Sequence, residues 1–285
     1  MTLTQIAADK VVNKLLLGQD YRIEIVSLIE SEFLQYAVDF FKKVVYAKLE
    51  GQKITKDWYK NEFLDPKKVS LDEIIINSGL NKKTISNMYN SAKREIVLEI
   101  CPEYYDNLAK NIEELTKIED LNVQLKLELN SVSVKLDLNE TLIVVNTLAV
   151  KRAAIRGGAW STVGKVVEKQ LMTKLCEMAG VPKEYYNQEK LPKSVREVDF
   201  YLFNGKNEPQ KCEVKLMGKG NPESADGALA RDVKIFVADK LSDLNKQELE
   251  RKQILWVELR EQESLIKFKE ILKELEIPFI LDKLD

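Results

Sequence analysis

The sequence of 285 residues contains no histidine. Without an imidazole, the chain cannot form the Ser/His or Cys/His pairs of nucleophilic enzymes, a histidine metal site, or a histidine-based catalytic motif. Any acid-base chemistry must therefore come from carboxylates, from lysine, or from water bound to a metal ion. This one absence excludes many of the common catalytic arrangements.

Cysteines are few, and long apolar runs are absent. Cys101, Cys176 and Cys212 are an odd number without the short spacing of a zinc site, so we expect buried, reduced thiols. No apolar run approaches the roughly 20 residues that span a bilayer. The first residues, MTLTQIAADK, also lack the basic and apolar regions of a signal peptide. We expect a cytoplasmic protein without membrane contact.

The overall composition is that of a soluble globular protein, with 45% hydrophobic and 32% charged residues. The length allows two domains, or one domain with a helical addition. The net charge of −2 gives no general attraction to phosphate. A surface that binds nucleic acid would therefore have to be a local basic patch.

The N-terminal part is predicted to be mainly helical up to about residue 120, because its apolar residues recur every three to four positions. The polar stretch from Gly51 to Pro66 is predicted to be a connection. From Leu121 the residues alternate between apolar and polar, and the alternation changes phase at Asn130-Ser131, which predicts a hairpin. We expect a helical region over 1–120 and a second domain over 121–285.

The second domain is predicted to be mixed α/β. A helix is expected from Asn139 to Ala154, a break at Arg156-Gly157-Gly158, and a second helix from Ser161 to Met178 that Gly180 closes. Four strand-like segments follow, and then a helix over 264–275 and an apolar run expected to be a strand. These segments are VDFYLF, KCEVKLM, VKIFVA and ILWVEL, and the final run is IPFIL.

Three charged residues interrupt two of these apolar strand segments. Asp199 begins the first strand, a turn at Asn204-Gly205 follows, and Glu213 and Lys215 lie in the second. Residues two apart project from the same face of a strand, and a hairpin brings Asp199 to the same place. Two carboxylates can hold Mg²⁺, and a lysine can orient or deprotonate the attacking water and offset charge. An ordinary charged sheet face is the alternative.

The pattern resembles the PD-(D/E)xK motif of nucleases, with Asp199 as its first acid, Glu213 as its second and Lys215 as its lysine. The sequence departs from the motif at Val198, where its name has proline. The segment Asp65-Pro66-Lys67 carries similar letters, but it lies in a polar connection rather than in paired strands. The strand context therefore favours the centre at 199, 213 and 215.

Three further residues are candidates for the same site. Glu168 lies at the edge of the apolar stripe of its helix, and the resemblance implies an acid from this helix; a solvated glutamate is the alternative. Arg156, with the glycines and tryptophan that follow it, suits close approach to a DNA backbone, or forms only a turn with a buried tryptophan. Lys219 lies in a basic, glycine-containing loop that contacts phosphate or only connects two elements.

Residues 71–90, LDEIIINSGLNKKTISNMYN, resemble a helix-turn-helix, with Gly79 at the turn and Ile85 facing inward. Ile75 departs from the pattern, because a small residue is usual there. The alternative is a helical hairpin in the core. The predicted DNA-contacting residues of the second helix are Lys82, Lys83, Thr84, Ser86, Asn87 and Asn90.

The order of these parts looks like that of type II restriction endonucleases similar to the CfrBI group. The resemblance is good over about 145–240 and looser before it. It implies a restriction-endonuclease-like sheet core flanked by helices, double-stranded DNA as substrate, Mg²⁺ as cofactor, a homodimer, and a cognate DNA methyltransferase. It also implies a short palindromic site, of which CCWWGG is an example. A DNA-binding regulator that does not cut, and a structure-specific repair nuclease, are the competing functions.

Overall fold

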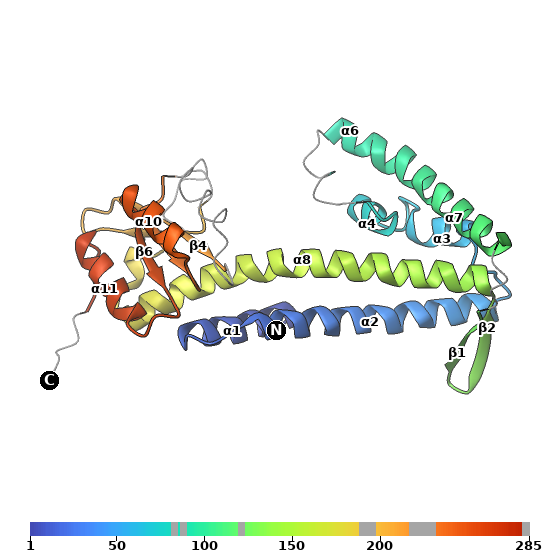
Figure 1. The fold of residues 1–285 in the computed structure, drawn as a ribbon, viewed down its shortest axis with the longest axis horizontal. Helices are drawn as coiled ribbons and strands as arrows, with labels where there is room; N and C mark the ends of the chain where they lie inside the picture. The colour runs from blue at the N-terminus through green and yellow to red at the C-terminus, as the bar shows by residue number, and fades with distance from the viewer. Residues whose placement is uncertain (81–84, 86–89, 119–122, 188–197, 217–231, 281–285) are drawn as a thin grey trace. The chain divides into compact units, whose positions relative to one another are not determined.

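The computed structural model describes residues 1–80, 85, 90–118, 123–187, 198–216 and 232–280 (Figure 1). The chain separates into two compact units, one formed by 29–158 and the other by 1–28 together with 159–285. The boundary near residue 120 that the sequence favours lies inside the first of these units. None of the described helices is both long enough and apolar enough to cross a membrane.

The unit formed by 29–158 is mainly helical, in agreement with the sequence. Helix α2 (Arg22–Leu49) runs beside the first part of α8 (Leu138–Ala179). Ion pairs join the two helices, from Lys48 to Glu140 at 2.8 Å and from Arg152 to Glu30 at 2.6 Å. The shorter elements of this unit are α3 (Lys56–Phe63), α4 (Leu71–Asn77), α6 (Asn90–Glu95), the π-helix η1 (Ile96–Ile100) and α7 (Cys101–Ile118).

Helix α3 lies inside the stretch that the sequence predicts to be a connection, so that prediction is wrong. The Thr55 side chain accepts a hydrogen bond from the Trp58 backbone and caps the helix. Trp58, Tyr59 and Phe63 are all buried in the core of this unit. The aromatic residues that made the stretch look irregular are the ones that anchor the helix.

The hairpin at Asn130-Ser131 is confirmed. Strand β1 (Leu125–Leu129) pairs antiparallel with β2 (Val132–Leu136), and Leu129 lies opposite Val132. Asn130 and Ser131 have φ angles of 50° and 64°, the positive values that a two-residue hairpin turn requires. The change of phase in the apolar pattern therefore located the turn correctly.

Helix α8 is a single helix of 42 residues, so the break predicted at Arg156-Gly157-Gly158 is wrong. Glycine lowers helix stability by about 1 kcal/mol relative to alanine, which two long flanking segments can offset. The C-terminal end agrees with the sequence, because the helix ends at Ala179 and Gly180 follows with a φ of 76°.

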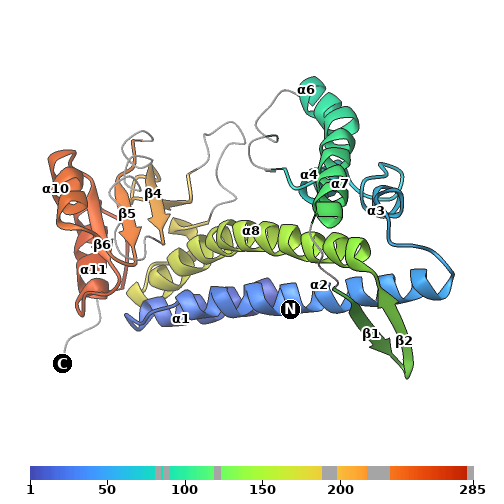
Figure 2. The same cartoon turned by 45° about the vertical axis from the view of Figure 1, so that its right-hand side comes forward.

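The other unit contains the mixed sheet, which confirms the α/β prediction. Helix α1 (Leu3–Leu16) precedes α2, and the short η2 (Lys183–Tyr185) follows α8. The sheet has the order β3-β4-β5-β6, in which β3 is antiparallel to β4 and the other neighbours are parallel. Helices α10 and α11 lie next to β6 (Figure 2). Their bounds are β3 (Phe200–Phe203), β4 (Pro209–Lys215), β5 (Ile235–Ala238), α10 (Asp243–Arg251), β6 (Leu255–Glu258) and α11 (Ser264–Glu274).

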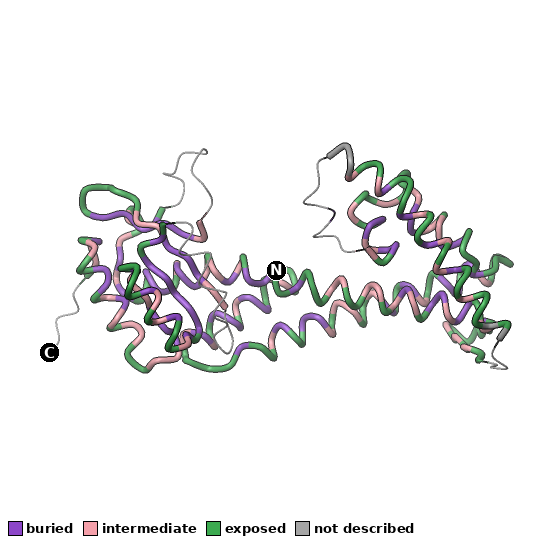
Figure 3. Tube along the Cα trace, turned by 45° about the horizontal axis from the view of Figure 1, so that its top comes forward, coloured by how far each residue is buried: buried purple, intermediate pink, exposed green. Residues whose placement is uncertain are grey.

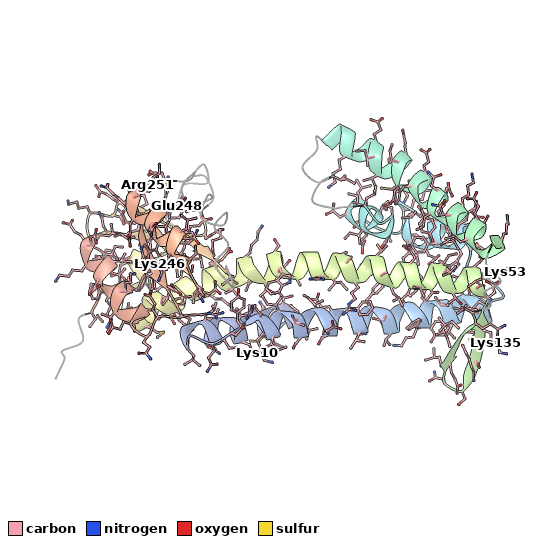
Figure 4. The ribbon with its side chains drawn as sticks, viewed as in Figure 1. Lys10, Lys53, Lys135, Lys246, Glu248 and Arg251 are labelled. Carbon is pink, nitrogen blue, oxygen red and sulfur yellow. The ribbon has the colours of Figure 1, made fainter. Side chains whose placement is uncertain are left out.

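Two details of this unit correct the sequence prediction. Helix α10 lies between β5 and β6, where no helix was predicted, and Ser242 caps it. Lys246 of α10, labelled in Figure 4, forms an ion pair with Glu258 of β6 at 2.8 Å. The predicted final strand is also wrong, because residues 277–280 form no strand; the Ile280 backbone instead donates a hydrogen bond to the Gly180 carbonyl at 3.0 Å.

The core of this unit lies on the sheet, whose strands are buried along much of their length (Figure 3). Val163, Val167 and Leu171 of α8 are fully buried as well. All three cysteines are free and buried, as the sequence predicts. The sheet and the last part of α8 thus form one well-packed body that can hold charged side chains in fixed positions.

Candidate active site

The antiparallel register of β3 and β4 brings two acids together. Phe200 pairs with Cys212, so the residue before the first and the residue after the second, Asp199 and Glu213, lie opposite each other. The Asp199 carboxylate accepts a hydrogen bond from the Val214 backbone at 2.9 Å, which fixes its orientation. The hairpin therefore places both carboxylates on the same face of the sheet, at the end where β3 begins and β4 ends.

Lys215 is in contact with both acids. Its Nζ lies 2.7 Å from Glu213 Oε1 and 3.6 Å from Asp199 Oδ2. The Glu213 side chain is fully buried, whereas that of Lys215 is 30% exposed. A buried carboxylate is costly without a partner, and the ammonium beside it provides one. The lysine end of the cluster remains accessible to a ligand.

The protonation of Lys215 follows from its neighbours. Burial by itself lowers the pKa of the ammonium, but the hydrogen bond with Glu213 and the charge of Asp199 outweigh that effect. The pKa of Lys215 is therefore raised above its usual value of 10.5. The side chain is a cation at neutral pH in this arrangement.

Glu168 of α8 lies in the same electrostatic environment. Burial, and next the charge of Asp199, raise the pKa of the Glu168 carboxyl from 4.5 to about 7. Lys215 opposes this shift, and the nearby Lys165 on the exposed side of α8 does so too. A solvated glutamate would not experience these effects, so α8 contributes a third carboxyl group to the cluster.

The sequence analysis missed another buried carboxylate, which lies at the same end of the sheet as the cluster. Asp239 directly follows β5, is fully buried, and donates its backbone N–H to the Lys215 carbonyl at 3.4 Å. Its carboxylate lies 3.7 Å from Arg260 Nη2. The sequence does carry a signal for this residue, since Asp239 directly follows the apolar run VKIFVA. An acid at that place is also typical of a surface loop, so the sequence alone did not mark it as part of the site.

The other residues predicted for this site are not part of the cluster as the structure describes it. Arg156 is exposed on α8, and Trp160 is 39% exposed, so the interpretation as a turn with a buried tryptophan is wrong. Lys219 lies outside the described residues. The competing Asp65 precedes a turn, and its carboxylate accepts a hydrogen bond from the Lys67 backbone at 2.9 Å. Asp65 is therefore not part of a paired strand.

The helix-turn-helix-like segment is described only in part. Helix α4 forms its first helix, Gly79 turns the chain with a φ of 87°, and Ile85 is buried as expected. Ile75 is fully buried too. Most of the predicted DNA-contacting residues lie outside the described residues, namely Lys82, Lys83, Thr84, Ser86 and Asn87; Asn90 begins α6, but its side chain is not described.

The acids can supply part of a metal site. Within the described residues, no three acidic or cysteine side chains form a complete metal-binding group. Mg²⁺, however, commonly takes only one or two carboxylates from a protein and fills its remaining positions with water and phosphate oxygens. The hard oxygen donors of Asp199 and Glu213 fit this ion.

Comparison with protein families places the chain in a known class. A family model described as CfrBI restriction endonuclease matches residues 5–246, which is most of the chain. The mixed α/β fold and this match define the protein as a nuclease of the restriction endonuclease class, with DNA as its substrate. The chain belongs to the CfrBI restriction endonuclease family. Neither the curated proteins nor the solved structures contain a significant match.

Proposed function

We propose that the protein is a type II restriction endonuclease that hydrolyses both strands of a short palindromic DNA sequence in the presence of Mg²⁺. The observation that carries this proposal is the cluster at the end of β4, in which Lys215 contacts Asp199 and Glu213. The CCWWGG type of site is the first sequence to test. A homodimer, a cognate methyltransferase and a cytoplasmic location complete the proposal.

The chain's own residues would divide the work as follows. Asp199 and Glu213 would hold the divalent cation, and their fixed positions follow from the hairpin and from the Val214 hydrogen bond. When bound, Mg²⁺ would lower the pKa of its water and offset the charge of the phosphate. Lys215, as a cation, would orient the attacking water and stabilise the charge that develops on the phosphate oxygens.

Two further side chains support the same role. Glu168 would adjust the charge of the cluster, because its pKa of about 7 lets it take up or release a proton near neutral pH. Arg156 on the exposed face of α8 would contact a DNA phosphate, a contact that positions the duplex without reading its sequence. The segment 71–90 is the proposed reader of base edges.

The direct test is a digest of plasmid DNA with the purified protein and Mg²⁺, followed by sequencing of the ends. A type II enzyme gives fixed double-strand breaks within one short sequence. Breaks that follow junctions or flaps would instead identify a structure-specific nuclease. A folded protein that cuts none of a varied set of DNAs with Mg²⁺ or Mn²⁺ would contradict the proposal.

The Lys215→Ala variant tests the site. We expect a loss of at least about 100-fold in cleavage rate, because the variant lacks a charge that stabilises the transition state. Binding of DNA in Ca²⁺, measured by fluorescence anisotropy, is expected to persist. Lys206→Ala is the matched control, since Lys206 lies on the loop of the same hairpin, 72% exposed, and pairs with the exposed Glu276. Full activity of Lys215→Ala would place the site elsewhere.

A further inference from the structure

Trp160 continues the buried apolar stripe of α8. Val163, Val167 and Leu171 of this stripe are fully buried. Position 160 lies three residues before Val163 and seven before Val167, which is the spacing of a single helix face. Trp160 is nevertheless 39% exposed. The stripe therefore continues past the region in which the described residues bury it.

The path of α8 along β4 explains where the stripe is left open. Cys176 acts electrostatically on Cys212 in the middle of β4. Glu168, eight residues earlier in the helix, acts on Lys215, three residues later in the strand. The helix covers about 12 Å over this stretch and the strand about 10 Å, so α8 runs beside β4 in the opposite direction. Trp160 lies about 12 Å further along the helix than Glu168, and therefore past the end of β4.

A glycine separates Trp160 from the carboxylate of Glu168. A Cβ at Gly164, halfway between the two, would lie 3.8 Å from Glu168 Oε1. The carboxylate therefore leans back over the glycine, as side chains on a helix generally do. From Gly164 to Trp160 is one helical turn, about 6 Å along the axis. The indole is thus close to the acid cluster, with no side chain at the position between them.

We infer that Trp160 packs on a deoxyribose of the strand that is cut, close to the scissile phosphate. The inference rests on the proposed function, because it takes the cluster as the place where that phosphate binds. A separation of about 6 Å is the length of about two base-pair steps along a duplex. The indole therefore reaches a nucleotide about one or two steps from the cut.

The structure of a duplex favours a sugar over a base as the partner of the indole. The faces of paired bases are covered by their neighbours in the stack, whereas the sugars lie on the outside with the phosphates. A flat apolar ring can cover a sugar, and a contact to the backbone positions the duplex without reading its sequence.

Basic side chains nearby favour a nucleic-acid backbone as the occupant. Lys165 and Lys169 are exposed on α8, and Lys165 acts electrostatically on Glu168. At about 100° per residue, both lysines lie on one flank of Glu168 and Trp160 lies on the other. A DNA strand that crosses the helix at Glu168 would meet ammonium groups on one side and the indole on the other.

Tryptophan fluorescence tests the contact without any cleavage. The chain has three tryptophans, of which Trp58 is buried and Trp256 is partly buried with Lys246 Nζ 4.8 Å from the centre of its ring. Addition of duplex DNA in Ca²⁺ is therefore expected to change the emission of Trp160. The change should disappear in Trp160→Phe. If that variant binds DNA and shows the same change as the wild type, Trp160 is not at the contact.

The affinity of the full-length protein for a labelled duplex in Ca²⁺ is the second measurement. Trp160→Ala is expected to weaken binding about tenfold, and Trp160→Phe, which keeps an aromatic ring, by no more than about threefold. Met178→Ala is the matched control and should bind normally, because Met178 is 46% exposed at the other end of α8, about 27 Å away along the axis. Normal affinity of a folded Trp160→Ala variant overturns the inference.

Duplexes with single abasic positions distinguish a sugar from a base. If Trp160 contacts a sugar, Trp160→Ala weakens binding equally on the intact duplex and on every abasic one. A loss that vanishes at one abasic position assigns the contact to a base and overturns the inference. A protein that needs Trp160 to bind DNA but never cuts it contradicts only the proposed function, whereas a protein that binds no DNA contradicts both.

Discussion

At the scale of single residues, the site depends on how charge is balanced inside a packed body. Glu213 is fully buried, and the ammonium of Lys215 beside it offsets the cost of that burial. Asp199 accepts a backbone hydrogen bond as well. Burial, and next the charge of Asp199, raise the pKa of Glu168 to about 7, so this carboxyl retains its proton up to near neutral pH. Each acid of the cluster is thus held by a different interaction.

The Glu168→Gln variant is expected to change how stability depends on pH in metal-free buffer. Because the folded carboxyl has a pKa of about 7 and the unfolded one about 4.5, the folded protein holds the extra proton. The stability that the folded protein gains from holding this proton is fully present below pH 4.5 and is lost as the pH rises through 7. The neutral glutamine should therefore raise the melting temperature at pH 8 by a few degrees, about 2 to 4 °C, relative to the wild type.

Glu177→Gln is the control for that measurement. Glu177 lies on the same helix, but its side chain is 42% exposed and pairs with the exposed Lys174. Its substitution should give no comparable gain at pH 8. If Glu168→Gln changed the melting temperature by the same amount at pH 4.5 and at pH 8, the carboxyl would not be holding a proton in the fold.

The sequence predicted the grouping of Asp199, Glu213 and Lys215, because residues two apart share a face of a strand and a hairpin brings its two strands together. It did not predict that the Val214 backbone orients Asp199, since such a bond depends on the exact position of the strand end. It also left open whether Glu168 is solvated. That question depends on how α8 lies against the sheet.

At the scale of elements, tertiary packing overrides local composition at two places where the sequence prediction is wrong. The two glycines did not end α8, and the apolar run that begins at Ile277 did not form a strand over 277–280. Helix α10 was missed because its sequence is polar, with few apolar residues to reveal a helical period. The prediction of the hairpin at 130–131 is confirmed because the conformation of a short turn depends mainly on the residues in it.

Substituting the glycines of α8 by alanine should stabilise the protein. Both Gly157 and Gly158 lie inside a continuous helix, and an added Cβ would meet no atom within 4 Å at either position. We expect Gly157→Ala and Gly158→Ala each to raise the free energy of unfolding by about 0.5 to 1 kcal/mol. Urea denaturation measures the change.

Gly180→Ala is the opposite control. Its φ of 76° is unfavourable for alanine, and the new Cβ would lie 3.0 Å from Ile280 Cβ. This variant is expected to be less stable than the wild type by at least about 1 kcal/mol. If alanine at 157 or 158 were destabilising as well, the chain would have a true break there, as the sequence pattern suggested.

At the scale of the whole molecule, the chain combines a mainly helical unit with a unit that contains the sheet and the candidate active site. The sequence predicted both classes of structure, but it placed the boundary near residue 120. The compact units divide the chain within α2 and α8 instead. A boundary inside a helix leaves no proline-rich or glycine-rich linker, so composition could not reveal it.

Folding without a divalent cation is the prediction at this scale. In a zinc finger the metal supplies the folding free energy, so a chelator unfolds the protein. Here the packed sheet and α8 supply the core, and we expect a cooperative melting transition in EDTA with the helical circular dichroism retained. Addition of Mg²⁺ should raise the melting temperature by binding the folded state. A chain that is unfolded in EDTA would contradict this.

The contact between Lys215 and Glu213 bears on whether the chain folds before or after it binds a metal ion. Because the buried acid brings its own counter-charge from two residues along the same strand, a newly synthesised chain can complete its fold before it meets any metal. Folding and metal binding are then separate steps. Under the proposed function, the folded protein would then bind DNA without cutting it until a divalent cation binds.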